Sequence, residues 1–255
     1  MALDSAPVLE AKNISVEFGG LKAVDDVSFE IPDRSVVSLI GPNGAGKTTF
    51  FNVLTGLYKP TSGFVIYNNE DITGLVPHKI AEKGLARTFQ NIRLFGLMTA
   101  EENVMVAMHS HLKAGIVGTI IGTPQQRREE REARAEAQAL LNFVGIGKTA
   151  KEFARNLSYG DQRRLEVARA LALRPKVLLL DEPTSGLDPA QRRGVGELIV
   201  SLKESYAVVF STHQMIEVVE WADRFVWLSN GQIRAQGETS SVTAKDLDGL
   251  LESAK

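Results

Sequence analysis

The fold is decided by the stretch Gly41-Pro42-Asn43-Gly44-Ala45-Gly46-Lys47-Thr48, which matches the pattern G-x-x-x-x-G-K-[ST]. Its glycines allow backbone N–H groups to wrap a phosphate without Cβ clashes. A helix beginning near Lys47 would point its N-terminal dipole at the same anion. Lys47 would offer a positive charge to the β- and γ-phosphates, and the Thr48 hydroxyl would ligate Mg²⁺. The stretch therefore predicts a nucleotide-binding loop.

The flanking sequence predicts a strand before this loop and a helix after it. Residues 36–40 (VVSLI) are a short apolar run, typical of a buried parallel strand. Two alternating segments between residues 14 and 31 are typical of half-buried strands. After the loop, apolar residues recur at the spacing of one helix face, at Phe50, Val53, Leu54 and Leu57. Residues 59–63 break that helix, and a strand at 64–67 leads to a predicted turn at Asn68-Asn69.

A helical region of roughly 70–80 residues then separates two strand-rich parts of the chain. Within it, acidic and basic residues are interleaved over residues 125–136, with Glu130 and Arg134 placed as a favourable pair. Apolar residues below this run follow helical spacing, at Ala133, Ala137, Leu140, Leu141 and Val144. We interpret the run as a solvated helix face, with nucleic-acid or membrane-surface binding as the alternative.

Two short apolar runs in the last third of the chain are followed by residues whose side chains can take part in catalysis or metal binding. Asp181 and Glu182 follow the run 177–180. An Asp at such a strand end lies near Mg²⁺ in P-loop proteins, and the next carboxylate can orient or deprotonate a water. His213 follows the run 207–210, at a strand end where α/β sheets bind ligands. Residues 224–234 read as a hairpin with Asn230-Gly231 at its turn.

Two further helix starts have both a functional and a structural explanation. Asp188 precedes Pro189, which is the pattern of a helix N-cap with Pro at the first helical position. Ser158 and Gly160 precede an apolar-periodic helix, where they would form a second anion site or an ordinary N-cap.

Composition narrows the function classes further. The 255 residues include 29 basic and 31 acidic side chains, which argues weakly against a nucleic-acid binder that works through bulk positive charge. The chain has no Cys, which excludes disulfides and cysteine metal sites. The apolar run 114–122 is about nine residues long, against about 20 needed to span a membrane. The first residues lack the pattern of a signal peptide. We therefore expect a cytosolic chain that another chain would have to hold at any membrane.

In their order along the chain, these motifs resemble those of the ATP-binding subunits of ABC transporters. Residues 41–48 are similar to the Walker A loop, residues 177–181 to the Walker B strand, residues 157–162 to the signature motif and residues 185–188 to the D-loop. Gln90 stands in the Q-loop position and His213 in the switch-histidine position, and Phe18 resembles the aromatic residue that stacks on adenine.

The resemblance implies an α/β fold of the ABC ATPase type, with two subdomains. A P-loop (RecA-like) core with an antiparallel β lobe would comprise residues 1–90 and 173–255, and a helical subdomain would comprise residues 91–172. It also implies a head-to-tail dimer. ATP would lie between residues 41–49 of one subunit and Ser158 and Gly160 of the other.

The resemblance also implies roles for single residues. ATP would be bound by Phe18, Gly41, Asn43, Gly44, Ala45, Gly46, Lys47, Thr48, Thr49, Ser158, Gly160 and Asp188. Mg²⁺ would be held by Thr48, Gln90 and Asp181. Glu182 would activate the attacking water and His213 would contact the γ-phosphate, with Lys47 and Gln90 completing the catalytic set.

Within the family, residues 87–95 (RTFQNIRLF) and 157–160 (LSYG) resemble the branched-chain amino acid importers, as does the insert around Thr123-Pro124. Most family members have Gly where this chain has Tyr159. The SGLD sequence at 185–188 and the tail after Gly237 depart from that branch. Amides or urea are therefore the competing choice of cargo. The competing functions are those of a soluble ABC ATPase outside transport, a P-loop kinase and a nucleotide-binding switch without turnover.

The resemblance implies partners that this chain lacks. They are transmembrane permease subunits, a second ATP-binding subunit that is identical or related, and, indirectly, a solute-binding protein. No nucleic acid is expected. The chain would be cytoplasmic, bound through the permeases to the inner face of the cell membrane.

Overall fold

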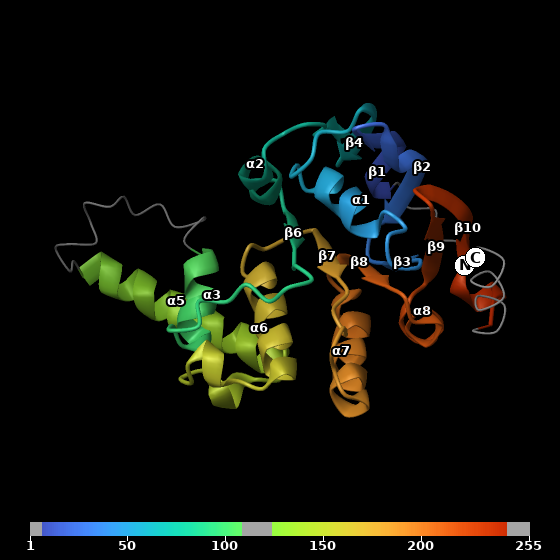
Figure 1. The fold of residues 1–255 in the computed structure, drawn as a ribbon. Helices are drawn as coiled ribbons and strands as arrows, with labels where there is room; N and C mark the ends of the chain where they lie inside the picture. Colours follow the sequence, from blue (N-terminus) through green and yellow to red (C-terminus); the bar gives the residue numbers. More distant parts are fainter. Residues whose placement is uncertain (1–6, 109–123, 244–255) are drawn as a thin grey trace. The chain divides into compact units, whose positions relative to one another are not determined.

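The computed structural model describes residues 7–108 and 124–243, which form two compact units (Figure 1). One unit comprises the chain up to Gln90 together with the chain from Lys176 onward. The other comprises Asn91–Pro175. The second unit is thus an insertion in the sequence of the first. The apolar run 114–122, Thr123 and the tail from residue 244 lie outside the described residues.

A four-stranded antiparallel sheet forms one layer of the first unit. Its strands are β1 (Pro7–Phe18), β2 (Leu21–Pro32), β4 (Ser62–Tyr67) and β5 (Glu70–Asp71), in the order β2-β1-β4-β5. Asn68 and Asn69, at φ 48° and 63°, join β4 to β5. Both residues adopt the left-handed conformation that a tight hairpin turn requires, so the predicted turn is confirmed.

A six-stranded sheet forms the second layer. Its strands are β3 (Val36–Ile40), β6 (Leu85–Arg87), β7 (Val177–Asp181), β8 (Ala207–Thr212), β9 (Arg224–Ser229) and β10 (Gln232–Glu238), in the order β10-β9-β3-β8-β7-β6. All neighbours are parallel except β9 and β10. The three central strands β3, β8 and β7 are buried at every residue, which explains why they read as continuous apolar runs.

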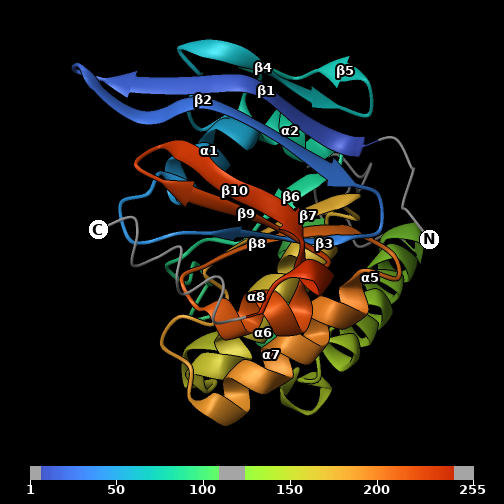
Figure 2. The ribbon, with the colours of Figure 1, turned by 90° about the vertical axis from the view of Figure 1, so that its right-hand side faces the viewer.

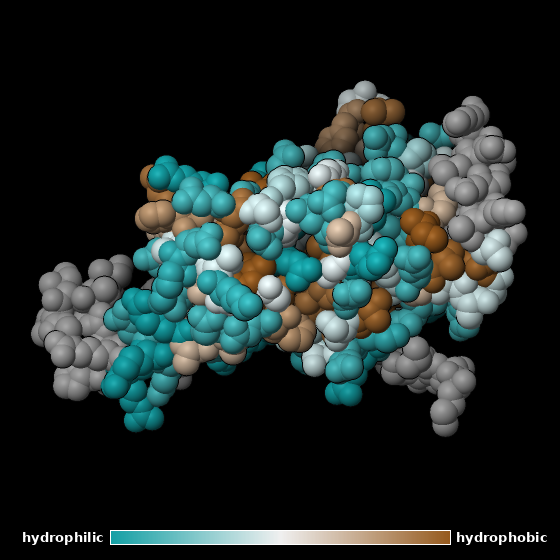
Figure 3. Space-filling model, turned by 90° about the horizontal axis from the view of Figure 1, so that it is seen from below, coloured by the Kyte–Doolittle hydropathy of each residue, from teal (hydrophilic) through white to brown (hydrophobic). Residues whose placement is uncertain are grey.

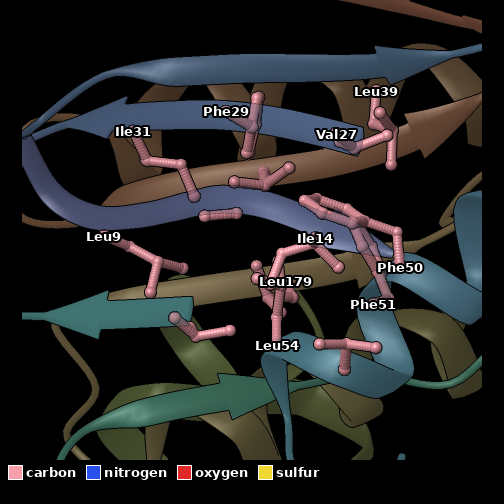
Figure 4. Packing of buried hydrophobic residues seen from close by; sticks show 14 of the residues in the cluster. Leu9, Ile14, Val27, Phe29, Ile31, Leu39, Phe50, Phe51, Leu54 and Leu179 are labelled. Atoms are coloured by element: carbon pink, nitrogen blue, oxygen red, sulfur yellow. The ribbon is translucent and has the colours of Figure 1, made fainter. Parts of the chain in front are cut away.

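Helices fill the space between the sheets and cover the outer face of the parallel sheet (Figure 2). They are α1 (Lys47–Leu54), α2 (Pro77–Glu82), α7 (Pro189–Leu202), α8 (Met215–Trp221) and the 3₁₀ helix η4 (Thr239–Ser241). Figure 4 shows side chains of β1 and β2 pointing toward those of α1, and the rings of Phe29 and Phe50 meet edge to face at 5.8 Å. This core fixes the helix that follows the glycine-rich loop.

The prediction that the first helix includes Leu57 is wrong, because a glycine ends the helix earlier. Gly56 has φ 71°, and its N–H donates to Val53 O at 3.0 Å. The N–H of Leu57 donates to Asn52 O at 2.8 Å. These two bonds form a Schellman motif with glycine in the left-handed position. Leu57 is consequently 45% exposed.

Within the described residues of the second unit, the regular elements are helices, joined by irregular segments and by a β-bridge between Thr99 and Phe153. It contains α3 (Ala100–Met108), α5 (Pro124–Phe143), the 3₁₀ helices η2 (Gly147–Thr149) and η3 (Ala154–Asn156), and α6 (Tyr159–Leu171). The predicted apolar stripe of α5 is buried, with Leu140 at its edge only half-buried. The predicted ion pair forms between Arg134 and Glu130 at 2.9 Å.

None of the helices within residues 7–108 and 124–243 is both long and apolar enough to cross a membrane. Hydrophilic side chains dominate the face drawn in Figure 3, where the apolar areas are separate patches.

Candidate functional site

The candidate site forms where four neighbouring parallel strands end at one edge of the six-stranded sheet. Gly41 follows β3, Glu182 follows β7, and His213 follows β8. Gln90 follows β6 after a short segment that stays on the sheet, because the N–H of Thr88 donates to Leu179 O at 2.9 Å. The carboxyl ends of parallel strands are where α/β sheets bind ligands. Motifs that are distant in sequence therefore meet here.

The glycine-rich loop needs its glycines for both conformation and packing. Gly44 and Gly46 have φ 82° and 104°, a region that favours glycine. A Cβ on Gly41 would lie 2.1 Å from Leu228 O, and one on Gly46 would lie 2.4 Å from Ala23 O. Gly46 is the N-cap of α1 and offers no side chain to its N–H groups. The first N–H groups of the helix are thus left for a ligand of negative charge.

The Lys47 ammonium is buried at the base of this loop, with only 4% of the residue exposed. Its Nζ donates to Gly41 O at 2.7 Å and to Pro42 O at 3.1 Å, and lies 3.9 Å from Glu182 Oε1. Burial lowers the pKa of Lys47, while the carboxylates of Glu182 and Asp181 oppose this shift. A phosphate bound in the loop would add negative charge close to this ammonium and favour its charged form.

A cleft of about 460 Å³ opens beside the loop. The predicted residues that line it are Asn43, Gly44, Ala45, Gly46, Lys47, Thr48, Thr49, Gln90 and Glu182. The prediction missed five lining residues, namely Leu21, Lys22 and Ala23 of β2 and the turn residues Asn230 and Gly231. The turn was visible in the sequence, but its place beside the loop depends on the bond from Gly231 N–H to Ala45 O at 3.0 Å.

Five predicted residues of this unit lie outside the cleft lining, and two of them, Asp181 and His213, are described below. Gly41 is buried beneath the loop. Phe18 is 47% exposed at the end of β1, where its ring meets that of Tyr58 edge to face at 5.4 Å. Asp188 caps α7 by accepting from the N–H groups of Ala190 and Gln191, both at 2.9 Å. The N-cap explanation of Asp188 is therefore observed in the structure.

Asp181 is buried and held by two partners that sequence reasoning missed. Its Oδ2 accepts from Arg87 at 2.7 Å, and its Oδ1 accepts from the Ser211 hydroxyl at 2.8 Å. Arg87 also donates to Asn52 and to Thr55 of the segment around α1, at 2.7 and 3.3 Å. Arg87 begins the stretch RTFQNIRLF, but nothing in that stretch indicates this role, because its partners lie far away in sequence. It orients the carboxylate that ends β7.

Glu182 has a backbone conformation that is unusual for its residue type. Its φ is 47°, which costs a residue with a Cβ about 1 kcal/mol or more. The N–H of Glu182 donates to the Ser211 hydroxyl at 2.9 Å, which holds this conformation. The carboxylate lies 3.4 Å from Gln90 Nε2, and 3.9 Å from both Lys47 Nζ and His213 Nδ1. The structure thus brings the four predicted catalytic residues together around one carboxylate.

The residues predicted to hold Mg²⁺ have the right donor chemistry. A hydroxyl from Thr48, an amide from Gln90 and a carboxylate from Asp181 are hard oxygen donors. Among the described residues no cluster of three or more His, Cys, Asp or Glu side chains could hold a metal alone. Both Asp181 oxygens already accept hydrogen bonds, which favours contact through water.

The second helix start that was predicted to bind an anion, the N-terminus of α6, lies in the helical unit. It is capped by a side chain of the same segment. Ser158 is the N-cap of α6, and its Oγ accepts from the Asp161 N–H at 3.1 Å. The same hydroxyl donates to Asp161 Oδ2 at 2.9 Å. Gly160 is buried in the first turn. The ordinary N-cap is thus present, and Asp161 is hydrogen-bonded to the capping serine.

Tyr159 is tied to buried charges of α6. Its hydroxyl accepts from Arg163 at 2.9 Å, and the guanidinium lies 5.3 Å from the ring centroid. Arg163 pairs with Glu166 at 3.2 Å, and Glu166 accepts from the N–H of Arg93 at 2.9 Å. Burial raises the pKa of Glu166, against the effect of these partners. Tyr159 is therefore anchored within the helix that it begins.

Comparisons with known proteins extend over nearly the whole chain. Residues 24–185 match the family model described as ABC transporter. The chain is 44% identical over 240 residues to the high-affinity branched-chain amino acid transport ATP-binding protein BraF of Pseudomonas aeruginosa, covering 93% of this chain and 94% of that protein.

Two solved structures have the same fold. One is an ATP-binding cassette of an ABC transporter in its ADP conformation, with TM-score 0.81 and 29% identity, covering 97% of this chain and 96% of that one. The second is a dimeric bacterial ABC transporter cassette, with TM-score 0.76 and 27% identity, covering 91% and 98%.

Proposed function

This chain belongs to the ABC transporter family, and from that premise we propose that it powers an importer of branched-chain amino acids. As a family member it is an ATPase, and its fold is that of the ABC cassettes. The observation that carries the choice of cargo is the 44% identity, over 93% of the chain, to a branched-chain amino acid transport ATP-binding protein. Cargo itself would be selected by permeases and a solute-binding protein, which are separate chains.

In the proposed mechanism, the glycine-rich loop and Lys47 hold the β- and γ-phosphates of ATP. Glu182 orients and deprotonates the attacking water, and His213 contacts the γ-phosphate. Mg²⁺, held by Thr48, Gln90 and water bound to Asp181, would neutralise charge on the phosphates. The 3.9 Å distances from Glu182 to both Lys47 and His213 support a shared site for these groups.

The second half of the site would come from another cassette. Ser158 and Gly160 of that cassette would meet the phosphates bound at Lys47, in a head-to-tail dimer. The dimeric relative supports this assembly. Closing the dimer would then complete the catalytic site, because phosphoryl transfer depends on positioning and on neutralising charge. Permease subunits docked on the cassettes would bring the protein to the membrane.

Hydrolysis and assembly are tested with Glu182→Gln. We expect the variant to bind ATP with ordinary affinity and to accumulate as a dimer on size-exclusion chromatography with ATP and Mg²⁺. Its phosphate release should fall by about 100-fold or more, as for a lost general base. A variant with wild-type turnover would remove Glu182 from this role. Exposed Glu220→Gln is the matched control and should behave as wild type.

Cargo is tested by uptake in the source organism after deletion of the gene. We expect uptake of labelled leucine, isoleucine and valine to fall and to be restored by the wild-type gene but not by Lys47→Ala. Labelled urea and short amides are measured beside them. If uptake of leucine stays intact while urea or amide uptake is lost, the cargo proposal is wrong and the ATPase assignment stands.

A further inference from the structure

One buried carboxylate of the first unit has no part in the mechanism above. Glu217 lies in the first turn of α8 and is 0% exposed. Its Oε1 accepts from the Thr184 hydroxyl at 2.7 Å, and its Oε2 accepts from the Thr212 hydroxyl at 2.6 Å. Arg192 Nε of α7 lies 3.6 Å from Oε1. Three segments therefore meet at a single side chain.

Two of these segments carry proposed catalytic residues. Thr184 belongs to the turn that begins at Glu182, which is closed by the bond from Ser185 N–H to Glu182 O at 3.1 Å. Thr212 directly precedes His213. The Thr212 hydroxyl also accepts from the N–H of Gln214 at 3.0 Å, so it fixes the backbone on both sides of the histidine. Glu217 thus joins the Glu182 turn to the His213 segment.

The Thr212 carbonyl extends this connection to the glycine-rich loop. It accepts from the N–H of Gly41 at 3.3 Å. Arg192 extends it in the opposite direction, since its N–H donates to Asp188 O at 2.9 Å at the start of α7. The Glu217 carboxylate is therefore linked to the glycine-rich loop through one residue, Thr212, and to the proposed D-loop aspartate through one residue, Arg192.

A carboxylate at this position is costly for the fold. Burial raises the pKa of Glu217, against its two hydroxyl donors and Arg192. The remaining buried residues of α8 are Met215, Val218 and Trp221, which pack as ordinary apolar groups. An apolar residue at 217 would complete that packing without desolvating a charge. A carboxylate, however, offers a separate oxygen to each of the two hydroxyl hydrogens.

We propose that Glu217 is a positioning residue for ATP hydrolysis, which holds the Glu182 turn and the His213 segment in one fixed relation. The proposal rests on the roles proposed above for Glu182 and His213. Glu217 does not touch the cleft, and it acts through the two threonines. A shift of either segment would move Glu182 Oε1 and His213 Nδ1 apart from their 3.9 Å separation. Displacements of about 1 Å can lower turnover by up to 100-fold.

The test is steady-state hydrolysis by Glu217→Gln. An amide places its one oxygen toward one threonine and turns its NH₂ group, which is a donor, toward the other. We expect kcat to fall by about tenfold while the KM for ATP stays within about twofold, because the loop is unchanged. Exposed Glu220→Gln on the same helix is the matched control and should keep wild-type kcat and KM.

A double-mutant cycle separates positioning from a general loss of structure. In a His213→Ala background, Glu217→Gln should lower kcat by clearly less than about tenfold, because the relation between Glu182 and His213 that Glu217 fixes no longer contributes to turnover. A full tenfold loss in that background, or a wild-type kcat for Glu217→Gln alone, would overturn the proposal. If His213→Ala and Glu182→Gln each keep wild-type turnover, the proposed catalytic roles fail instead.

Single hydroxyl deletions keep the proposal testable if Glu217→Gln does not fold. Thr184→Val and Thr212→Val each remove one of the two donors and preserve side-chain shape. We expect each to lower kcat by a few-fold at unchanged KM, with non-additive effects in the double variant. Two variants with wild-type kcat would overturn the proposal as well.

Discussion

The N-termini of α1 and α6, the two helix starts predicted to bind an anion, differ in what satisfies their N–H groups. At α1 the N-cap is Gly46, which has no side chain to offer, and a buried lysine follows it. At α6 the N-cap is Ser158, whose hydroxyl accepts from Asp161 N–H and donates to the Asp161 carboxylate. The first start leaves its donors for a ligand, while the second is satisfied by its own chain.

This difference indicates that the two helix N-termini have different roles in binding a phosphate. The α1 start has both the free N–H groups and a buried cation, so it can bind a phosphate by itself. The α6 start has an acidic residue in its first turn, and the buried Arg163 that follows is already paired with Glu166. We therefore expect the N-terminus of α6 to contact only a phosphate that is already bound at another site. This is the behaviour expected of the completing half of a dimer site.

Lys47→Ala is the change with the largest expected effect, because it removes the cation that distinguishes the α1 start. We expect ATP hydrolysis to fall by at least about 100-fold, with weaker ATP binding as well. Phosphate release as a function of ATP concentration measures both. Exposed Lys79→Ala is the control. Wild-type turnover in Lys47→Ala would refute the assignment of the glycine-rich loop.

Ser158→Arg tests whether the α6 start acts only in the dimer. The long side chain should obstruct contact with a second cassette, and we expect ATP-dependent dimerisation to be lost in the Glu182→Gln background. Binding of ATP by the single cassette should stay within about twofold, since the α1 start is untouched. Light scattering and nucleotide titration measure the two effects. Ser240→Arg, on an exposed residue, serves as the control. Weakened binding to the monomer would contradict the comparison.

Tyr159→Gly should have a modest effect, because the proposed phosphate contacts of this helix start are Ser158 and Gly160. We expect turnover to fall by no more than about fivefold, mainly through the lower helix propensity of glycine, about 1 kcal/mol. Tyr159→Phe keeps the ring and removes only the bond from Arg163. It should lie between the wild type and Tyr159→Gly. A loss as large as that of Lys47→Ala would give Tyr159 a direct role.

The smallest expected effect concerns the stability cost of the buried lysine. Because burial lowers the pKa of Lys47, the unfolded chain binds more protons than the folded one between that lowered pKa and about 10.5. The destabilisation is complete below this window and disappears above it. Lys47→Met should therefore gain stability relative to wild type at neutral pH and lose that advantage as pH rises toward 10.5. Urea unfolding across this range measures it, and a pH-independent difference would contradict it.

Local patterns predicted most of the elements that surround the site. The apolar runs predicted β3, β7 and β8, and turn residues predicted both hairpins. These signals are local because period, run length and turn chemistry depend only on neighbouring residues. The helix after the loop was predicted too long, although Gly56 was there to end it.

Contacts between distant segments could not be predicted in this way. No local pattern indicates that Arg87, Ser211 and Glu217 orient Asp181, Glu182 and the His213 segment. Each is recognised only by a partner on another strand or helix. Side chains of this kind are chosen for the geometry of their partners, and that geometry arises only when the sheet has formed.

By itself, the sequence determined the chemistry of this protein: a glycine-rich loop with its lysine, two carboxylates at a strand end, and a histidine at another. Only the tertiary structure decided which side chains from distant segments contact each other. It placed Lys47, Gln90 and His213 around Glu182 and paired Asp181 with Arg87. The physical reason is that backbone propensity is encoded in neighbours along the chain, whereas burial and hydrogen bonding depend on neighbours in space.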